Sequence, residues 1–351
     1  MIGGRNIVRY ALATQAYMSG TVRLKDRDLS GHAHLVGTRR GLFAANPGGV
    51  KLIAYGLFYG LAVRDDLIFA FEACDDVRSP SARGRIVRFR REGDRIVAAD
   101  VIATGLDNGC HQIDIIDDRL CVTDTYGQRI LRYPLTGGEG EVLRPIPGHA
   151  PRDDGPGEDR DTDSDHWARG YAHVNSVIAC GDAILLMLHN GADRTGRASE
   201  IARLDRDWRL IDRIPVDGLG CHGFAVLESG AVLTCGSMAG EIVSTDGVKV
   251  AVCDMMTRGL SVDADTVVVG GTAFAGRDAR DEEQGRIVFL DRAYRHLATV
   301  PIPAPPMEIR RIDGRDRSLS DHVARVGPGQ PVFTNTNDPT TASGIARSLG
   351  P

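Results

Sequence analysis

Residues 110–125 read CHQIDIIDDRLCVTDT, and residues 221–236 read CHGFAVLESGAVLTCG. In each stretch an apolar segment leads into a turn with acidic residues or Gly, and a second apolar segment follows. Residues 58–73 (FYGLAVRDDLIFAFEA) and 257–273 (TRGLSVDADTVVVGGTA) follow the same design. Within the segments apolar residues alternate with other residues, which is typical of strands rather than helices. The chain therefore repeats a strand–turn–strand unit.

Each unit continues into a further pair of strands. Residues 84–87 and 285–288 both read GRIV, and residues 240–243 read GEIV at the equivalent place. Four strands per unit, repeated every few tens of residues, are the signature of β-propeller blades. The many glycines (42) and the low aromatic content (5%) suit short strands joined by tight turns. Five units open near residues 58, 110, 172, 221 and 257.

A sixth unit opens at residues 307–314 (MEIRRIDG) but lacks its outer strands. Strand patterns without a partner lie near the N-terminus, at residues 34–38 and 41–44 and then at 50–53. We expect residues 32–54 to complete the sixth blade, because pairing the two chain ends closes the ring and removes an exposed sheet edge. The predicted fold is all-β, a six-bladed β-propeller with four-stranded blades, closed by N-terminal strands.

The predicted propeller spans residues 32–323, between an N-terminal segment (1–31) and a C-terminal tail (324–351). Residues 148–170 are acidic and rich in Gly and Pro, and they interrupt the passage from the second blade to the third. We expect this insertion to be a solvated loop and a candidate lid. Within it, residues 159–165 alternate acids as a calcium loop does, but the glycine that such a loop needs is missing.

The composition limits the cellular environment and the binding partners that we expect for the protein. The net charge is −5 and no long run of Lys or Arg occurs, so nucleic acid is not an expected partner. No apolar run is long enough to span a membrane, and the N-terminus lacks the hydrophobic region and cleavage site of a secretory signal. The seven cysteines, without any CxxC, indicate buried free thiols in a reducing cytoplasm. The oligomeric state stays open.

The six units can be aligned on the last apolar residue before their first turn, and the alignment places one residue of each unit at an equivalent position. Equivalent positions on the inner strands of a propeller surround the central channel. We therefore expect the side chains four residues before this reference to face a common space. They are Tyr59, His111, His173, His222, Arg258 and Glu308.

Three of these six residues are histidines. Imidazole is the commonest neutral ligand of transition metals, and three protein ligands leave a fourth position open for water or substrate. We expect His111, His173 and His222 to hold a divalent transition metal, zinc in the first place, with copper, manganese or iron as alternatives. Gln112 and Asn175 are expected to orient the imidazoles through hydrogen bonds.

The other aligned residues supply complementary chemistry. Arg258 is suited to gripping a carboxylate or a phosphate. Tyr59 is a candidate proton donor, and Glu308 is either a fourth ligand or a general base. The remaining histidines are expected mostly in turns or loops, although His166 in the insertion could reach over the pocket. These weaker candidates are His32, His34, His149, His166, His189, His296 and His322.

The series HQID, HVNS, HGFAVLESG, TRGLSVD and MEIRRID at successive blade starts resembles the six-bladed propeller superfamily. That superfamily includes gluconolactonase and regucalcin-like proteins and NHL-repeat lyases. The chain is most similar to an uncharacterised bacterial propeller family, over about residues 32–313. The lactonase branch is similar in fold only, because its calcium site uses Glu, Asn and Asp where this chain has mostly His. The peptide-amidating lyases resemble it in chemistry, since they hold zinc on three channel histidines, though distributed differently over the blades.

Two classes of function fit these residues. The first is a metal-dependent enzyme, of lyase or hydrolase type, that acts on a small anionic molecule; a copper- or iron-dependent oxidase is a variant of it. The second is a non-enzymatic propeller that serves as a protein-interaction platform or a small-molecule sensor. Serine-hydrolase chemistry is not indicated, because the chain has no GxSxG elbow and no Ser at an aligned position.

Overall fold

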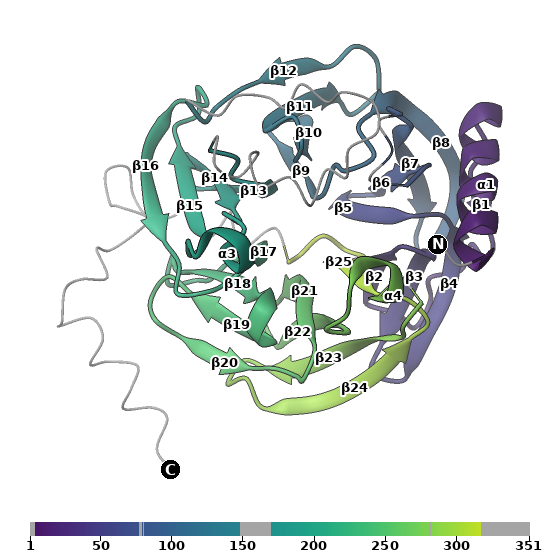
Figure 1. Ribbon diagram of the computed structural model, residues 1–351. Helices are drawn as coiled ribbons and strands as arrows, with labels where there is room; N and C mark the ends of the chain where they lie inside the picture. The colour runs from purple at the N-terminus through teal and green to yellow at the C-terminus, as the bar shows by residue number, and fades with distance from the viewer. Residues whose placement is uncertain (1–3, 77–78, 80, 148–169, 281, 317–351) are drawn as a thin grey trace.

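The computed structural model describes residues 4–76, 79, 81–147, 170–280 and 282–316. Six antiparallel sheets are arranged in a ring about a central channel (Figure 1). This arrangement confirms the predicted six-bladed propeller. The acidic insertion, apart from Gly170, and the C-terminal tail lie outside the described residues, as do His149, His166 and His322.

Five blades each consist of four consecutive strands, and the first strand of each blade lines the channel. The first blade contains β5 (Phe58–Arg64), β6 (Leu67–Ala73), β7 (Gly84–Glu92) and β8 (Arg95–Leu106). The second contains β9 (Ile113–Ile116), β10 (Arg119–Asp124), β11 (Arg129–Pro134) and β12 (Glu141–Leu143). The third contains β13 (Val174–Cys180), β14 (Ala183–Leu188), β15 (Glu200–Leu204) and β16 (Leu210–Pro215).

The remaining two of these five blades follow the same plan. The fourth contains β17 (Cys221–Val226), β18 (Val232–Gly236), β19 (Glu241–Ser244) and β20 (Lys249–Ala251). The fifth contains β21 (Met256–Val262), β22 (Thr266–Thr272), β23 (Gly285–Asp291) and β24 (His296–Ile302). Since the strands run up and down in turn, the start of each inner strand and the loop between the second and third strands lie at the same end of the channel.

The sixth blade joins the two ends of the described chain. Its inner strand is β25 (Pro306–Arg311), and its next strands are β2 (His34–Thr38), β3 (Gly41–Asn46) and β4 (Gly49–Tyr55). In the register of β2 with β25, Val36 lies opposite Ile309. This pairing confirms that N-terminal strands close the ring. One strand was not predicted: β1 (Arg23–Leu24) pairs with β4 and adds a fifth strand to this sheet.

The N-terminal segment also forms a helix that the sequence analysis did not predict, α1 (Gly4–Ser19). It packs on the outside of the first blade, with Ala13 and Ala16 buried. Arg85 fixes the end of the helix, because its buried guanidinium donates to the carbonyls of Ala16 (3.0 Å) and Thr21 (2.8 Å). The same guanidinium pairs with the buried carboxylate of Glu72 at 2.8 Å.

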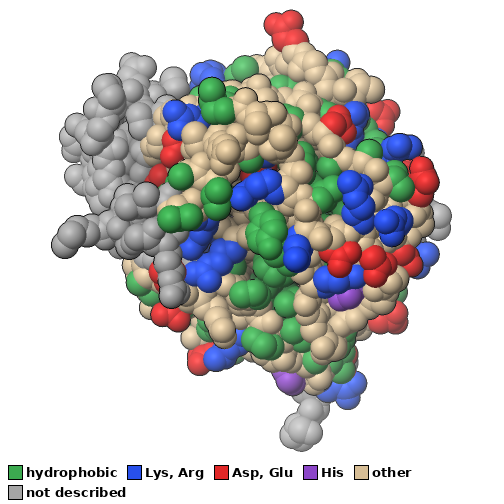
Figure 2. Space-filling view, turned by 90° about the vertical axis from the view of Figure 1, so that its right-hand side faces the viewer, with side chains coloured by type: hydrophobic (Ala, Val, Ile, Leu, Met, Phe, Trp, Pro, Cys, Tyr) green, Lys and Arg blue, Asp and Glu red, His purple; other side chains and the backbone are tan. Residues whose placement is uncertain are grey.

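The surface beside α1 carries mixed charge. Lys, Arg, Asp and Glu side chains are interspersed there, with hydrophobic side chains between them (Figure 2). The other helices in the described part of the chain are single turns in loops: α3 (Ala192–Thr195), η1 (Ser237–Ala239) and α4 (Arg277–Arg280). Among the described residues, no helix is both long and apolar enough to cross a membrane.

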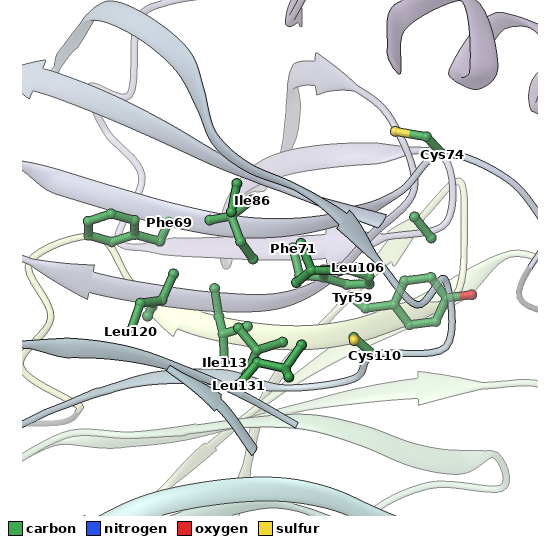
Figure 3. Packing of buried hydrophobic residues seen from close by; sticks show 14 of the residues in the cluster. Tyr59, Phe69, Phe71, Cys74, Ile86, Leu106, Cys110, Ile113, Leu120 and Leu131 are labelled. Carbon is green, nitrogen blue, oxygen red and sulfur yellow. The ribbon is translucent and has the colours of Figure 1, made fainter. Parts of the chain in front are cut away.

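The core lies between neighbouring blades. Phe69 and Phe71 of the first blade pack against Ile113 and Leu120 of the second (Figure 3). Five similar clusters between the other blades complete the circle. Each sheet is covered on both faces, which is why its strands are apolar on both sides. All seven cysteines are free, and all but Cys253 are buried. The propeller core therefore holds the channel-facing strands rigidly.

Candidate metal centre

The six aligned residues meet at one end of the channel. A pocket of about 260 Å³, part of it open to solvent, lies there between the inner strands. Five of the six aligned positions line it, and the sixth, His173, lies beside it with its ring centroid 5.1 Å from that of His111. The pocket is lined by Tyr59, His111, Gln112, Asn175, Ser176, His222, Gly223, Arg258, Met307 and Glu308.

The three aligned histidines form a compact group. One ligand nitrogen from each of His111, His173 and His222 lies within 4.8 Å of the other two. The ring centroid of His222 is 6.1 Å from that of His111 and 6.3 Å from that of His173. Glu308 does not belong to this group of close ligand atoms. Three imidazoles therefore converge on one point, as a site with an open fourth position requires.

Backbone carbonyls set the tautomers of two of these imidazoles. Nδ1 of His111 lies 2.7 Å from the carbonyl oxygen of Gly109, and Nδ1 of His222 lies 2.8 Å from that of Gly220. Because a carbonyl only accepts, each Nδ1 carries the proton and each Nε2 keeps its lone pair. Hydrogen bonds of this kind on the far nitrogen are typical of metal-bound histidines.

The Nε2 atom of His222 shows most clearly whether these residues fit a metal ion. It is buried and has no hydrogen-bond partner among the described residues. Leaving a buried polar atom unsatisfied costs roughly 1–3 kcal/mol. Burial, together with the positive charge of Arg258, holds the pKa of His222 well below its usual value, so the lone pair is available at neutral pH. The residues present therefore fit a transition-metal ion.

His173 is held in an unusual backbone conformation. Its φ is 54°, in the left-handed region, which costs a non-glycine residue roughly 1–2 kcal/mol. Its Nδ1 lies 2.9 Å from the hydroxyl of Tyr171. Strained residues of this kind cluster at functional sites. The surrounding structure thus holds the third imidazole where an unstrained backbone would not place it.

Irregular pairing just after the aligned residues turns them toward the channel. The register shifts between Phe58 and Leu61, between His222 and Ala225, and between Arg258 and Leu260. Each shift contains a glycine, and those of the first and third shifts are in close contact with their surroundings. A side chain on Gly60, for example, would lie 2.6 Å from the carbonyl oxygen of His111. The bulges re-aim the preceding side chains, as bulges beside active sites often do.

A buried charge cluster lies next to the histidines. Glu308 contacts Arg310, a fully buried side chain that also faces Asp114 and Asp316. Burial raises the pKa of Glu308 to about 8 and outweighs the opposing effect of Arg310, while two neighbouring carboxyls add to the increase. Burial likewise raises the pKa values of Asp114 and Asp316 to about 6. The single Arg310 guanidinium lies near three buried carboxyls and cannot balance the charge of all of them. The Glu308 carboxyl therefore keeps its proton at neutral pH.

Tyr59 has an apolar and a polar side. Its ring belongs to the cluster between the first two blades, 6.4 Å from the ring of Phe71, and its hydroxyl points away from that cluster (Figure 3). The ring centroid of Tyr59 is 6.1 Å from that of His111. The guanidinium carbon of Arg39 lies 5.9 Å from the centroid of the same ring. The structure thus fixes Tyr59 beside the first imidazole.

Gln112 and Asn175 contact neighbouring inner strands. The Gln112 amide oxygen accepts from the Val177 N–H at 2.7 Å, and the Asn175 amide donates to the Cys221 carbonyl at 2.9 Å. The groups within hydrogen-bond distance of the imidazoles include the two glycine carbonyls, the Tyr171 hydroxyl and two further hydroxyls. The latter are Thr125, 3.1 Å from Nδ1 of His111, and Ser237, 3.2 Å from Nδ1 of His222. That Gln112 and Asn175 orient the imidazoles stays a prediction.

His189 is the residue that sequence reasoning missed. It follows β14 directly, and its ring centroid lies 4.9 Å from that of His173 and 5.0 Å from that of His222. Its position after a second strand was the available signal, because such loops lie at the same end of the channel as the inner-strand starts. Of the other described histidines, His34 lies in β2 and not in a turn or loop, and His296 lies on the outer strand β24; neither joins the site.

Comparison with known proteins identifies the fold of the chain but no chemical activity. No protein-family model matches the chain, and no curated protein matches it in sequence. Among solved structures, a nidogen/laminin complex aligns at a TM-score of 0.53 and 11% identity, covering 80% of this chain and 97% of that chain. A protein of unknown function from Bacteroides caccae aligns at 0.51 and 14% identity, covering 80% and 99%. A streptogramin B lyase aligns more loosely, at 0.44 and 10% identity over 73% and 88%. At such identities the likeness concerns the propeller fold alone.

Proposed function

We propose that this protein is a metal-dependent enzyme that acts on a small anionic molecule at the mouth of its channel. The observation that carries the proposal is the group formed by His111, His173 and His222, in which a buried lone pair of His222 has no partner among the described residues. All-imidazole ligands suit zinc first, and also copper, manganese or iron. When bound, such an ion polarises a carbonyl or hydroxyl of the substrate or activates a water molecule.

Arg258 supports an anionic substrate. It lines the pocket, and after burial, which is the larger cause, its positive charge lowers the pKa values of both His189 and His222. A guanidinium so close to neutral imidazoles attracts a carboxylate or phosphate and orients it by paired hydrogen bonds. The anionic group therefore binds on the side of the pocket formed by the fourth and fifth blades.

Glu308 supports proton transfer. With its pKa raised to about 8, its carboxyl carries a proton at neutral pH and suits a general acid better than a base or a ligand. Tyr59, on the next inner strand, lines the same pocket and offers a second hydroxyl proton. Elimination and hydrolysis need only a polarised substrate and such proton donors, and so the proposed reaction is of lyase or hydrolase type. Copper or iron in the site would instead favour an oxidase.

The test is a comparison of metal-loaded and metal-free protein. Each is incubated with small carboxylates, phosphate esters and lactones, and binding and product formation are followed by NMR. The proposal predicts at least one anion whose conversion requires the metal and is lost in Arg258→Gln, although that variant still binds the metal. If anions bind with the same dependence on Arg258 and none is converted, the pocket serves a small-molecule sensor and the enzymatic proposal fails.

A further inference from the structure

A fourth imidazole, that of His189, lies beside the rings of His173 and His222, and its proton is placed differently from those of its neighbours. The backbone N–H of Gly191 donates to Nδ1 of His189 at 3.0 Å. A backbone N–H cannot accept, so Nδ1 of His189 keeps its lone pair and the ring carries its proton on Nε2. This is the reverse of His111 and His222, whose Nδ1 atoms face carbonyl oxygens.

Nε2 of His189 lies beside the segment that leads into His222. A side chain on Gly220, the residue whose carbonyl fixes His222, would lie 3.0 Å from Nε2 of His189. His189 is only partly buried, and its Nδ1 is the nitrogen that the Gly191 N–H occupies. Its Nε2–H is therefore a donor held in place by the protein and left available to a bound molecule.

The neighbouring charges indicate what that molecule offers. Arg258 is close enough to act electrostatically on both His189 and His222. Arg258 lines the pocket together with His222, and the His189 ring adjoins the His222 ring. A guanidinium and an imidazole N–H both donate hydrogen bonds, so together they match an acceptor that bears negative charge. A metal ion, which needs a lone pair, is not bound by a nitrogen that carries a proton.

We infer that His189 is not a fourth metal ligand but a hydrogen-bond donor, which with Arg258 holds an oxyanion of the substrate, a carboxylate or phosphate, beside the three-histidine group. This inference rests on the proposed function and deepens it, because it names the group that recognises the anion. It also explains why an imidazole adjoins the three ligands without sharing the carbonyl contacts that prepare two of them for a metal.

The first test does not depend on a metal. Long-range ¹H–¹⁵N spectra of metal-free protein with labelled histidines report which nitrogen of each ring is protonated, and a His189→Gln variant assigns the signals. The expected result is Nε2–H for His189 and Nδ1–H for His111 and His222. A proton on Nδ1 of His189 would overturn the inference, whether or not the protein binds metal.

The second test separates a donor from a ligand and from a purely structural residue. Cobalt is titrated into the wild type, His189→Ala, His189→Gln and His222→Ala, and azide is then titrated into the cobalt-loaded proteins while their visible spectra are recorded. We expect both His189 variants to keep the wild-type cobalt affinity. Azide binding should weaken roughly tenfold or more in His189→Ala and recover in part in His189→Gln, which still donates.

Each other outcome is informative. If His189→Ala loses cobalt as His222→Ala does, His189 is a ligand and the inference is wrong. If neither cobalt nor azide binding changes, His189 is only structural and the inference is again wrong. If the wild type itself binds no cobalt, the proposed function fails, and the tautomer spectra alone decide whether His189 presents a donor.

Discussion

Glu308 offers a prediction whose size follows from its surroundings. Its carboxyl is 3% exposed and shares Arg310 with two other buried carboxyls. The folded-state pKa of Glu308 is about 8, above the ordinary value of 4.5. Between these two values the folded protein holds a proton that the unfolded chain releases. The stability contributed by this group is therefore complete below pH 4.5 and is lost as the pH rises toward 8.

The magnitude is bounded by proton linkage. One proton retained only in the folded state changes the free energy of unfolding by at most about 1.4 kcal/mol per pH unit. Relative to Glu308→Gln, we expect the metal-free wild type to lose stability between pH 5 and pH 8 with a slope that approaches that limit. The lowered pKa values of His34, His189 and His222 act in the opposite direction, but they are common to both proteins and cancel in the comparison. Asp114 and Asp316 act in the same direction, but their effect is largely complete by pH 6, because their pKa values are about 6. The difference in slope between the wild type and Glu308→Gln from pH 6 to pH 8 thus belongs mainly to Glu308.

The assay is urea unfolding at pH 5, 6, 7 and 8 in the presence of a chelator. Glu308→Gln keeps the shape and the neutral charge of the protonated carboxyl, so it removes the Glu308 contribution to the slope and leaves the contributions of all other groups in place. Glu92→Gln, at an exposed position in β7, is the matched control and should keep the wild-type slope. The reasoning is refuted if wild type and Glu308→Gln show the same slope, because Glu308 is then ionised beside Arg310 and cannot serve as an acid.

Three further predictions concern the scaffold. Arg85→Met should lower the free energy of unfolding in urea by about 3–5 kcal/mol, because it leaves the buried Glu72 without its partner. The double variant with Glu72→Gln should recover part of this loss. An unchanged single variant would contradict the role given to Arg85. Removing residues 1–55 should expose an edge of β25 and give insoluble protein, and a soluble truncation that unfolds cooperatively would disprove closure of the ring. Gly270→Ala should lower the melting temperature and weaken anion binding, because its new side chain would clash with the carbonyl of Arg258, whereas Gly276→Ala, with open space around it, should change neither.

The repeats made the ring of channel residues predictable. Strands that alternate apolar residues, with a turn at a fixed place, fix the alignment of the blades, and the alignment brings Tyr59, His111, His222, Arg258 and Glu308 to one pocket. A further signal was present in the sequence, since Gly follows Tyr59, His222 and Arg258 directly. Those glycines mark the bulges that aim the three side chains into the channel.

What stayed hidden depends on backbone placement rather than on residue type. The tautomers of His111 and His222 are set by carbonyls two residues earlier, and any residue type provides a carbonyl. His189 was missed because the alignment considered only inner strands, while this residue enters the site from the end of a second strand. The helix α1 was missed because its stability comes from packing on the first blade and from Arg85, both distant in sequence.

The central claim is that the three aligned histidines hold one transition-metal ion. Its most direct test is the metal content per chain, measured after incubation with zinc and gel filtration, for the wild type and for His111→Ala, His173→Asn and His222→Ala. His173→Asn keeps a residue that tolerates the left-handed backbone, and His296→Ala, on the exposed strand β24, is the control. The account predicts one ion per chain in the wild type and the control and close to none in the three channel variants, all of them folded. A wild type that stays free of zinc, and also of copper, manganese and iron under the same treatment, would contradict it.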